Sequence, residues 1–315
     1  MEIRVKQLLF GLATIIIPPL AKSRIKIKSS KHSARYYYSV FLRHLVMLHK
    51  FGQIKEGKLP KSILELGPGA SLGFGIMALI CGVKKYTAFD VIEHVDNNKN
   101  IELFNELLIL FKNKTPIPDD KEYIGVIPKL DDYSFPNYLF DNFDLLLAEN
   151  RLNLIKKSIK RINKEKSMIN YITSFEEYEK TPNKYFNAIF SQAVLEHVED
   201  LNSVYNSMHK TLKSSGFMSH SIDYKSHGSA KSWNGHWSIN KFIWTLQKGR
   251  RDFFINRFPY SQHIKLLKDN GFEVICSQKQ KRKSKISKKK CAKEFDDILI
   301  SDLEISESFI IANNG

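Results

Sequence analysis

The sequence predicts an α/β fold in which a mostly parallel sheet carries helices on both faces. Residues 63–66 are typical of a short buried strand, which ends at Gly67-Pro-Gly69. An apolar segment compatible with a helix follows at 71–81, and residues 86–90 are typical of a second strand. A strand, a glycine turn, a helix and a strand in this order form a βαβ unit, whose strands pair in parallel.

The remaining elements follow from apolar periodicity and from turn residues. Helical spacing predicts helices at 31–51, 100–113, 201–212, near 239–247 and at 260–269. Further strands are expected at 168–172, 185–191, 217–222, 271–276 and 306–312, with residues 214–216 as the turn before the strand at 217–222. Residues 116–142 are rich in proline, aspartate and tyrosine without a clear period, which indicates an insertion.

The domain organisation expected from these patterns is one large unit with an amino-terminal extension. Residues 1–58 form an arm and a helical extension, and residues 59–315 form the main domain. We expect insertions in the main domain near 114–150 and 224–260, and a basic loop at 279–293. No internal repeat is visible.

Charge is concentrated in two segments of the 315-residue chain, whose formal net charge is +16. Residues 1–31 hold seven basic residues and one acid, and residues 279–293 hold nine basic residues and no acid. The rest of the chain is nearly neutral, so nucleic acid is not the expected partner. The three cysteines are too few and too scattered for a disulfide framework, which favours a reducing compartment, the cytoplasm.

The amino-terminal segment is apolar from residue 8 to residue 20 and has basic residues on both sides. It is too short to span a bilayer, which needs about 20 helical residues. Two interpretations remain. The segment packs on the core, or it is an interfacial helix that brings residues 1–31 to anionic lipid at the inner face of the cytoplasmic membrane.

The glycine turn predicts a ligand at the carboxyl edge of the sheet. Glycine permits a left-handed backbone and lets the chain approach a ligand closely. Leu72 stands where a dinucleotide fingerprint requires a third glycine, and no Walker motif follows. Asp90, at the end of the next strand, can accept hydrogen bonds from both hydroxyls of a ribose. These residues indicate an adenosine-bearing ligand.

Several motifs together resemble the class I S-adenosylmethionine-dependent methyltransferases. They are residues 63–69, Asp90, residues 190–200 and residues 212–216. The resemblance implies a Rossmann-like, seven-stranded sheet with helices on both faces and a reversed C-terminal hairpin. It implies S-adenosyl-L-methionine as cofactor, with contacts from Glu65, Gly67, Gly69, Asp90, Ser191, Gln192 and Leu195.

The chain is also similar to methyltransferases of bacterial surface-polysaccharide gene clusters. Shared features are the helix that starts at Ala34-Arg-Tyr36, residues 78–82 and residues 219–223. Position 70 is commonly acidic in that group, whereas this chain has Ala70. This departure concerns the detailed contacts of the glycine turn.

The residues expected near the methyl acceptor follow from the chemistry of methyl transfer. The reaction is an in-line displacement that requires alignment of the methyl donor with the acceptor and, for a hydroxyl acceptor, a base that removes its proton. The candidate catalytic residues are His197, His220 and Asp223. The candidate acceptor-binding residues are Glu196, His227, Asn234, His236 and Trp237. Some relatives bind a divalent ion through a Glu-x-x-Glu-His motif, but Ala193 replaces the first glutamate here, so no metal is expected.

The function expected from this reading is O-methylation of a small-molecule, sugar or glycan-linked acceptor. The basic run at 279–293 keeps an RNA methyltransferase as an alternative, although no RNA-binding module is recognisable. A non-catalytic scaffold that retains the cofactor fold is a third possibility. The intact Gly67, Gly69 and Asp90 set argues against the scaffold. The sequence does not define the oligomeric state.

Overall fold

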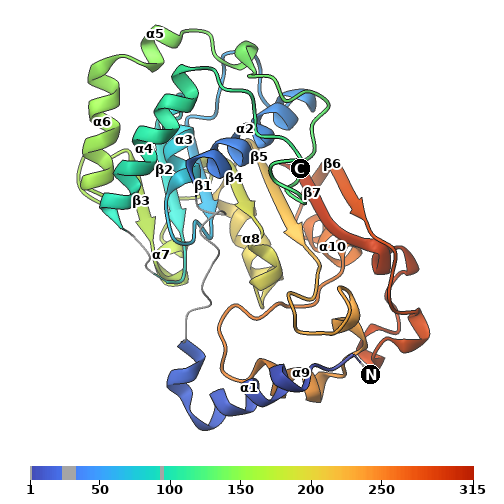
Figure 1. Ribbon diagram of the computed structural model, residues 1–315. Helices are drawn as coiled ribbons and strands as arrows, with labels where there is room; N and C mark the ends of the chain where they lie inside the picture. Colours follow the sequence, from blue (N-terminus) through green and yellow to red (C-terminus); the bar gives the residue numbers. More distant parts are fainter. Residues whose placement is uncertain (1, 23–32, 93–95) are drawn as a thin grey trace.

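The computed structural model describes residues 2–22, 33–92 and 96–315, and its centre is a seven-stranded sheet (Figure 1). The strand order is β3-β2-β1-β4-β5-β7-β6. The strands are β1 (Ser62–Leu66), β2 (Lys85–Phe89), β3 (Ile169–Ile172), β4 (Phe186–Gln192), β5 (Leu212–Asp223), β6 (Phe272–Lys281) and β7 (Ile305–Asn314).

The first five strands are parallel and the last two are not. β1 pairs in parallel with β2 and β4, β2 with β3, and β4 with β5. β7 lies antiparallel between β5 and β6. The expected seven-stranded α/β sheet with a reversed C-terminal hairpin is therefore confirmed.

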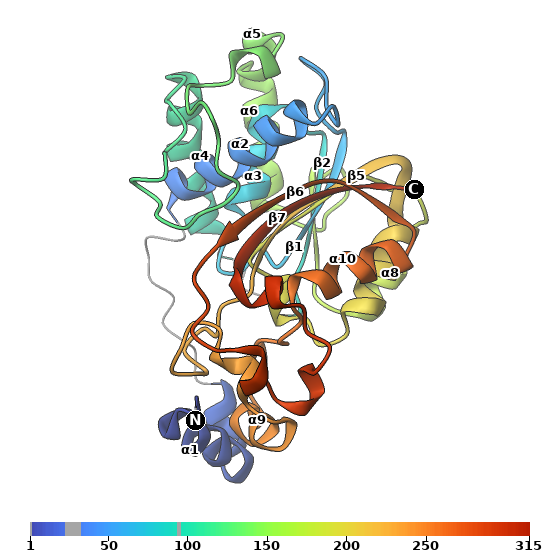
Figure 2. The ribbon, with the colours of Figure 1, turned by 90° about the vertical axis from the view of Figure 1, so that its right-hand side faces the viewer.

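Helices cover both faces of the sheet (Figure 2). One layer contains α2 (Ala34–Lys50), α3 (Gly73–Cys81), α4 (Asn97–Lys112) and α6 (Glu149–Lys160), with the short α5 (Phe143–Leu146) beside α6. The other layer contains α7 (Phe175–Glu179), α8 (Leu201–Thr211) and α10 (Tyr260–Asp269). Each layer encloses its own apolar core against the sheet.

Helix α2 belongs to the same core as the sheet, although the sequence analysis placed it in the extension 1–58. Twelve of its 17 residues are buried, and it packs on α3 and α4. Its buried polar residues are partnered. Arg43, for example, binds Asp120 and the carbonyl oxygens of Pro118 and Pro128. This network ties the irregular segment near 118–128 to the helix.

A second, smaller body lies beyond the carboxyl end of β5, and we call its residues, 2–22 and 224–258, the cap (Figures 1 and 2). It contains α1 (Val5–Ile16), η1 (Pro18–Lys22), η5 (Gly235–Ser238) and α9 (Lys241–Lys248). Ala230, Ile239, Trp244 and Ile255 form its apolar core, and Ile3 packs against them.

The two helices of the cap are in close contact. A Cβ added to Gly11 of α1 would overlap the carbonyl oxygens of Leu246 and Gln247 in α9, so only glycine allows this approach. The amino-terminal apolar segment thus packs on α9, whereas the first of its two interpretations placed it on the core. Residues 1 and 23–31 of the segment 1–31 lie outside the described residues.

Three local expectations differ from the structure. Residues 214–216 are not a turn before β5 but an irregularity within it, where the register passes from Phe186↔Leu212 to Ala188↔Phe217. Residues 279–281 of the basic run belong to β6. Helix α6 was not predicted. Across the described ranges, every helix is too short or too polar to cross a bilayer.

Candidate active site

Three loops meet at the carboxyl edge of the sheet because β1, β4 and β5 are parallel neighbours. Leu66 at the end of β1 pairs with Ser191, and Gln192 of β4 pairs with Ser221. A Cβ added to Gly67 would lie 2.6 Å from Cγ2 of Val194. The glycine turn after β1 therefore touches the loop after β4, which leads to the acceptor side.

The glycine turn has the backbone that its sequence predicts. Gly67 and Gly69 have φ angles of 61° and 68°, in the left-handed region that favours glycine. The amide of Gly69 donates a 3.1 Å hydrogen bond to Oδ2 of Asp90. The turn and the carboxylate predicted to bind the ribose thus lie side by side, which fits an adenosine-bearing cofactor.

Glu65 lies on β1, two residues before Gly67. Its carboxylate is buried and accepts a hydrogen bond from the Tyr86 hydroxyl. Burial, opposed by this hydrogen bond, raises the pKa of Glu65 to about 8. The side chain of Glu65 therefore joins β1 to β2.

Two further contacts of the turn were missed by the sequence analysis. The Tyr37 hydroxyl on α2 lies 2.6 Å from Oγ of Ser71, and Oδ1 of Asn100 on α4 accepts a 3.0 Å hydrogen bond from the Leu72 amide. A buried asparagine in an amphipathic helix is a signal for such a contact, but the sequence does not show what it binds.

The residues of β4 and its loop are mostly buried. Oγ of Ser191 lies 2.7 Å from Nδ1 of His220, and Oε1 of the half-buried Gln192 lies 3.2 Å from Nε2 of His44. Leu195 is part of the apolar core. His220 is 1% exposed, and burial lowers its pKa to about 3. His220 thus faces Ser191 inside the sheet.

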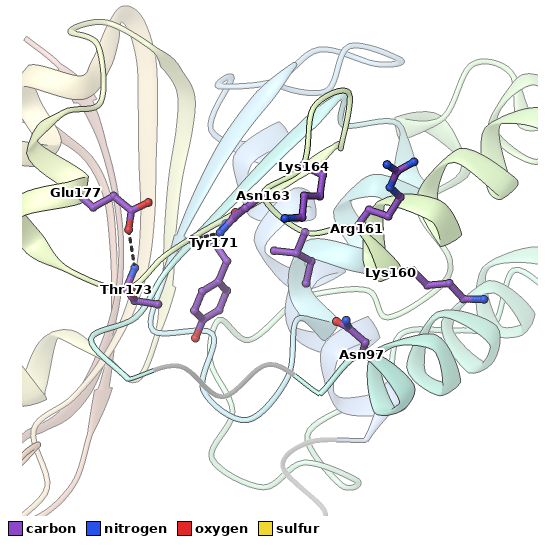
Figure 3. A pocket seen from close by; sticks show the side chains of 9 residues that line it. Asn97, Lys160, Arg161, Asn163, Lys164, Tyr171, Thr173 and Glu177 are labelled. Carbon is purple, nitrogen blue, oxygen red and sulfur yellow. Dashed lines mark hydrogen bonds between the residues drawn. The ribbon is translucent and has the colours of Figure 1, made fainter.

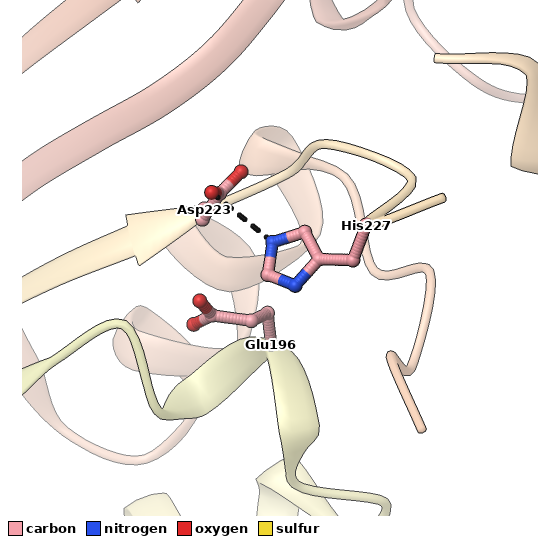
Figure 4. A group of neighbouring side chains, drawn as sticks. All are labelled: Glu196, Asp223 and His227. Atoms are coloured by element: carbon pink, nitrogen blue, oxygen red, sulfur yellow. Dashed lines mark ion pairs between the residues drawn. The ribbon is translucent and has the colours of Figure 1, made fainter. Parts of the chain in front are cut away.

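Glu196, Asp223 and His227 come together at the ends of β4 and β5, and we call them the Glu196 cluster (Figure 4). One potential ligand atom from each lies within 4.8 Å of the others. Nε2 of His227 is 3.1 Å from Oδ2 of Asp223. Burial opposes ionisation of Asp223, but the hydrogen bond from His227 and the charge of Lys225 hold its pKa below the usual value.

Glu196 differs from its neighbours because it is buried without a hydrogen-bond partner. It is 3% exposed, and among the described residues no group meets the geometry of a hydrogen bond to either carboxylate oxygen. Burial, reinforced by the charge of Asp223, raises the pKa of Glu196 well above its usual range. An unpaired buried carboxyl is costly.

His197 lies beside the cluster, with its ring centroid 5.4 Å from that of His227. Nδ1 of His197 is 2.6 Å from the carbonyl oxygen of Phe253, which can only accept. Nδ1 therefore carries the proton, and Nε2 has the basic lone pair. Burial, with the charge of His227 as the next cause, lowers the pKa of His197 to about 4, so the ring is neutral at pH 7.

The remaining candidates lie inside the cap. The side-chain amide of Asn234 donates hydrogen bonds to Oγ of Ser284 and to the carbonyl oxygen of Leu303. The indole N–H of Trp237 donates to the carbonyl oxygen of Arg257. His236 is buried, its ring centroid 4.4 Å from that of Trp237. The structure brings Asp223, Glu196, His197 and His227 together, and does not place Asn234 or Trp237 among them.

A separate pocket lies along the edge strand β3 (Figure 3). Its volume is about 480 Å³, and its lining includes Asn97, Arg161, Tyr171 and Glu177. It contains neither the glycine turn nor any member of the Glu196 cluster. The pocket is thus distinct from the carboxyl edge where β1, β4 and β5 end.

The fold and the glycine turn define a class I S-adenosylmethionine-dependent methyltransferase. A family model described as a methyltransferase domain matches residues 35–277, so the chain belongs to that family. The match begins within α2, in agreement with the packing of this helix in the core. S-adenosylmethionine is therefore the cofactor, and its sulfonium supplies the methyl group when it is bound.

Several solved structures of methyltransferases match this chain at low sequence identity. Phosphoethanolamine N-methyltransferase 2 from Haemonchus contortus is 13% identical over 93% of this chain and 60% of that chain, with a TM-score of 0.43. A methyltransferase from Methanosarcina mazei is 12% identical over 85% and 96%, with a TM-score of 0.43. One from Mesorhizobium loti is 13% identical over 90% and 99%, with a TM-score of 0.41. No curated protein matches the chain.

Proposed function

We propose that this methyltransferase O-methylates a hydroxyl-bearing acceptor, a sugar or a glycan-linked group, at the carboxyl ends of β4 and β5. The observation that carries the proposal is the tautomer and position of His197. Its Nε2 has the basic lone pair at neutral pH, and the ring lies next to Asp223 and His227. A hydroxyl loses its proton as the C–O bond forms, and a positioned imidazole can accept it.

His197 is the base in this proposal, and the other groups position it or the acceptor. The carbonyl oxygen of Phe253 fixes the tautomer of His197. Asp223 and His227 form a paired group at the same edge, suited to hydrogen-bond an acceptor hydroxyl. His220 is a weaker candidate than His197 because it is a buried residue of β5 whose Nδ1 lies 2.7 Å from Oγ of Ser191.

The experiment is methyl transfer from labelled S-adenosylmethionine to a panel of acceptors. The panel contains sugar nucleotides, lipid-linked glycans, small amines and RNA. We expect label in a sugar hydroxyl, identified by mass spectrometry as an O-methyl group. Transfer only to amines or only to RNA would overturn the proposal. Absence of transfer to the whole panel, with S-adenosylhomocysteine still bound, would favour the scaffold alternative.

We also propose that the protein is cytoplasmic and that its cap contacts an anionic membrane surface. Large apolar side chains on α1, η1 and α9 are exposed, among them Leu9, Ile16, Leu20 and Phe242. Exposed basic residues accompany them at Arg4, Lys6, Lys241 and Arg250. Apolar groups that insert between lipids, together with cations that meet anionic headgroups, are the usual features of an interfacial helix.

Liposome sedimentation tests the membrane contact. Wild-type protein is expected to sediment with vesicles that contain phosphatidylglycerol at low salt, and less at high salt because salt screens the cations. Ile16→Glu and Phe242→Glu are expected to reduce sedimentation. The matched control is Ile124→Glu, an 89% exposed residue outside the cap. Equal sedimentation of all variants, or a dimer formed through α1 in solution, would contradict the proposal.

A further inference from the structure

Glu196, Asp223 and His227 offer two carboxylates and one imidazole. Glu196 follows β4, whereas Asp223 ends β5 and His227 lies four residues after Asp223. Oxygen and imidazole nitrogen are ligands for divalent metals such as Zn²⁺ and Mn²⁺. Metal–ligand bonds of about 2.0–2.2 Å place two ligands at most about 4.4 Å apart. The three ligand atoms lie within 4.8 Å of one another. A movement of these atoms by a few tenths of an ångström therefore suffices for all three to bind one ion.

The unpartnered carboxylate of Glu196 is the observation that points to a ligand. Within the described ranges, both of its oxygens are buried and neither has a partner with hydrogen-bond geometry, although His227 and Asp223 are paired beside it. Figure 4 shows the Glu196 side chain below the Asp223–His227 pair. A cation at this position would satisfy oxygens that would otherwise lose their hydration without compensation.

Carboxyl groups outnumber lysine and arginine side chains around the Glu196 cluster. Lys225 lies 3.1 Å from Oδ2 of Asp223 and also contacts the buried carboxylate of Glu307. One ammonium thus faces three carboxyl groups: those of Glu196, Asp223 and Glu307. In the part of the chain that the structure describes, Lys225 makes no hydrogen bond to Glu196, and Oε2 of Glu307 has no hydrogen-bond partner. When all three carboxyl groups are ionised, two negative charges remain beside Lys225, and a divalent cation would balance them.

We propose that the Glu196 cluster binds a divalent metal ion, with Glu196, Asp223 and His227 as its protein ligands. The role of the metal ion rests on the proposed function. A metal with open coordination positions can hold an acceptor hydroxyl and lower the pKa of that hydroxyl. From the sequence alone no metal is expected, because Ala193 breaks the Glu-x-x-Glu-His motif. The structure offers a different set, in which β5 and the following loop supply the other ligands.

The test is direct metal binding, measured without the methyl-transfer reaction. Chelator-treated protein is titrated with Mn²⁺ and with Zn²⁺ by calorimetry, and bound Mn²⁺ is observed by electron paramagnetic resonance. We expect one site per chain. Glu196→Gln, which keeps the shape of the side chain, and His227→Gln should each weaken binding by at least tenfold, because mutation of even outer-shell partners costs 10–100-fold.

The matched control is Glu199→Gln. Glu199 is on the same loop but is exposed and pairs with Lys248, so its replacement should leave metal affinity unchanged. Affinity for S-adenosylhomocysteine and the unfolding temperature show whether each variant is folded. No saturable binding by wild type, or equal binding by folded Glu196→Gln, would overturn the proposal.

The two proposals fail in different ways. If metal does not bind and chelator treatment leaves transfer to a hydroxyl unchanged, the metal site is wrong while O-methylation stands. If metal binds with the expected mutational pattern but no hydroxyl acceptor is methylated, the proposed acceptor is wrong while the metal site stands.

Discussion

The glycine turn after β1 and the Glu196 cluster after β4 lie at the same edge of the sheet, yet they are assembled differently. The turn is one short segment whose φ angles require glycine, and its carboxylate, Asp90, ends the next strand of the same βαβ unit. The cluster combines the ends of β4 and β5 with the first residues of the cap. The first is therefore recognisable from local sequence, whereas the second exists only in the folded chain.

The largest expected effect is on the turn itself. Gly67→Val adds a Cβ that would lie 2.6 Å from Val194 in a backbone that disfavours side chains, so measurable binding of S-adenosylhomocysteine should disappear. Calorimetry measures it. Gly52→Val is the control, because Gly52 has φ +72° but nothing within 4 Å of an added Cβ. Equal losses in both variants would assign the effect to backbone strain alone.

On the acceptor side, turnover should change while cofactor affinity does not. His197→Ala is expected to lower kcat by roughly 10²–10⁴-fold on the authentic acceptor, since that is what a positioned base contributes. Asp223→Ala should also lower kcat. Turnover should persist on acidification until the pH approaches about 4, where the neutral imidazole of His197 becomes protonated. A wild-type rate in His197→Ala would eliminate it as the base.

Asp90→Ala should have a smaller effect than Gly67→Val, because it removes contacts without adding an obstruction. Two ribose hydroxyls lose a charged acceptor, and hydrogen bonds to charged groups contribute about 1.5–3 kcal/mol. We expect S-adenosylhomocysteine to bind roughly 10–150-fold more weakly by calorimetry. Asp132→Ala, in an exposed loop, is the control. Unchanged affinity in Asp90→Ala would remove the assignment of the ribose site.

The smallest effect concerns His44, a buried histidine of α2 that contacts β4 and β5. Burial lowers the pKa of His44 to about 4, so the unfolded chain binds this proton near pH 6.5 and the folded chain only near pH 4. The free energy of unfolding should fall as the pH falls through this window, by about 1–2 kcal/mol between pH 7 and 5 for this histidine. Urea titrations of wild type and His44→Asn measure it. A variant with the same pH slope as wild type would refute the contribution.

Much of the fold could be predicted because strands and amphipathic helices have local periods. The parallel pairing of β1 with β2 follows from the βαβ unit, and the reversed hairpin followed from the resemblance. Helix α6 was missed, although its apolar residues alternate with lysines at helical spacing. Residues 214–216 resembled a turn because serine and glycine favour turns, whereas the pairing of β5 with β4 continues past them.

The candidate site was predictable to the extent that it depends on one segment. Gly67 and Asp90 were found from their spacing. Asn234 and Trp237 were placed near the acceptor because they follow β5, but chain proximity does not show which side chains turn inward. The pairing of His44 with Ser219 and Gln192 joins residues more than 140 positions apart, and no local pattern reveals it.

The contact between α1 and α9 has a consequence for the order of synthesis. The Glu2 carboxylate accepts a hydrogen bond from the Ser232 amide, 230 residues later, and Gly11 contacts Leu246 and Gln247. At roughly 5–20 residues per second, a ribosome needs about 10–45 s to add the later segment. For most of that time the apolar arm is outside the exit tunnel without its partner. In the nascent chain it is available to a chaperone or a lipid surface before the cap exists.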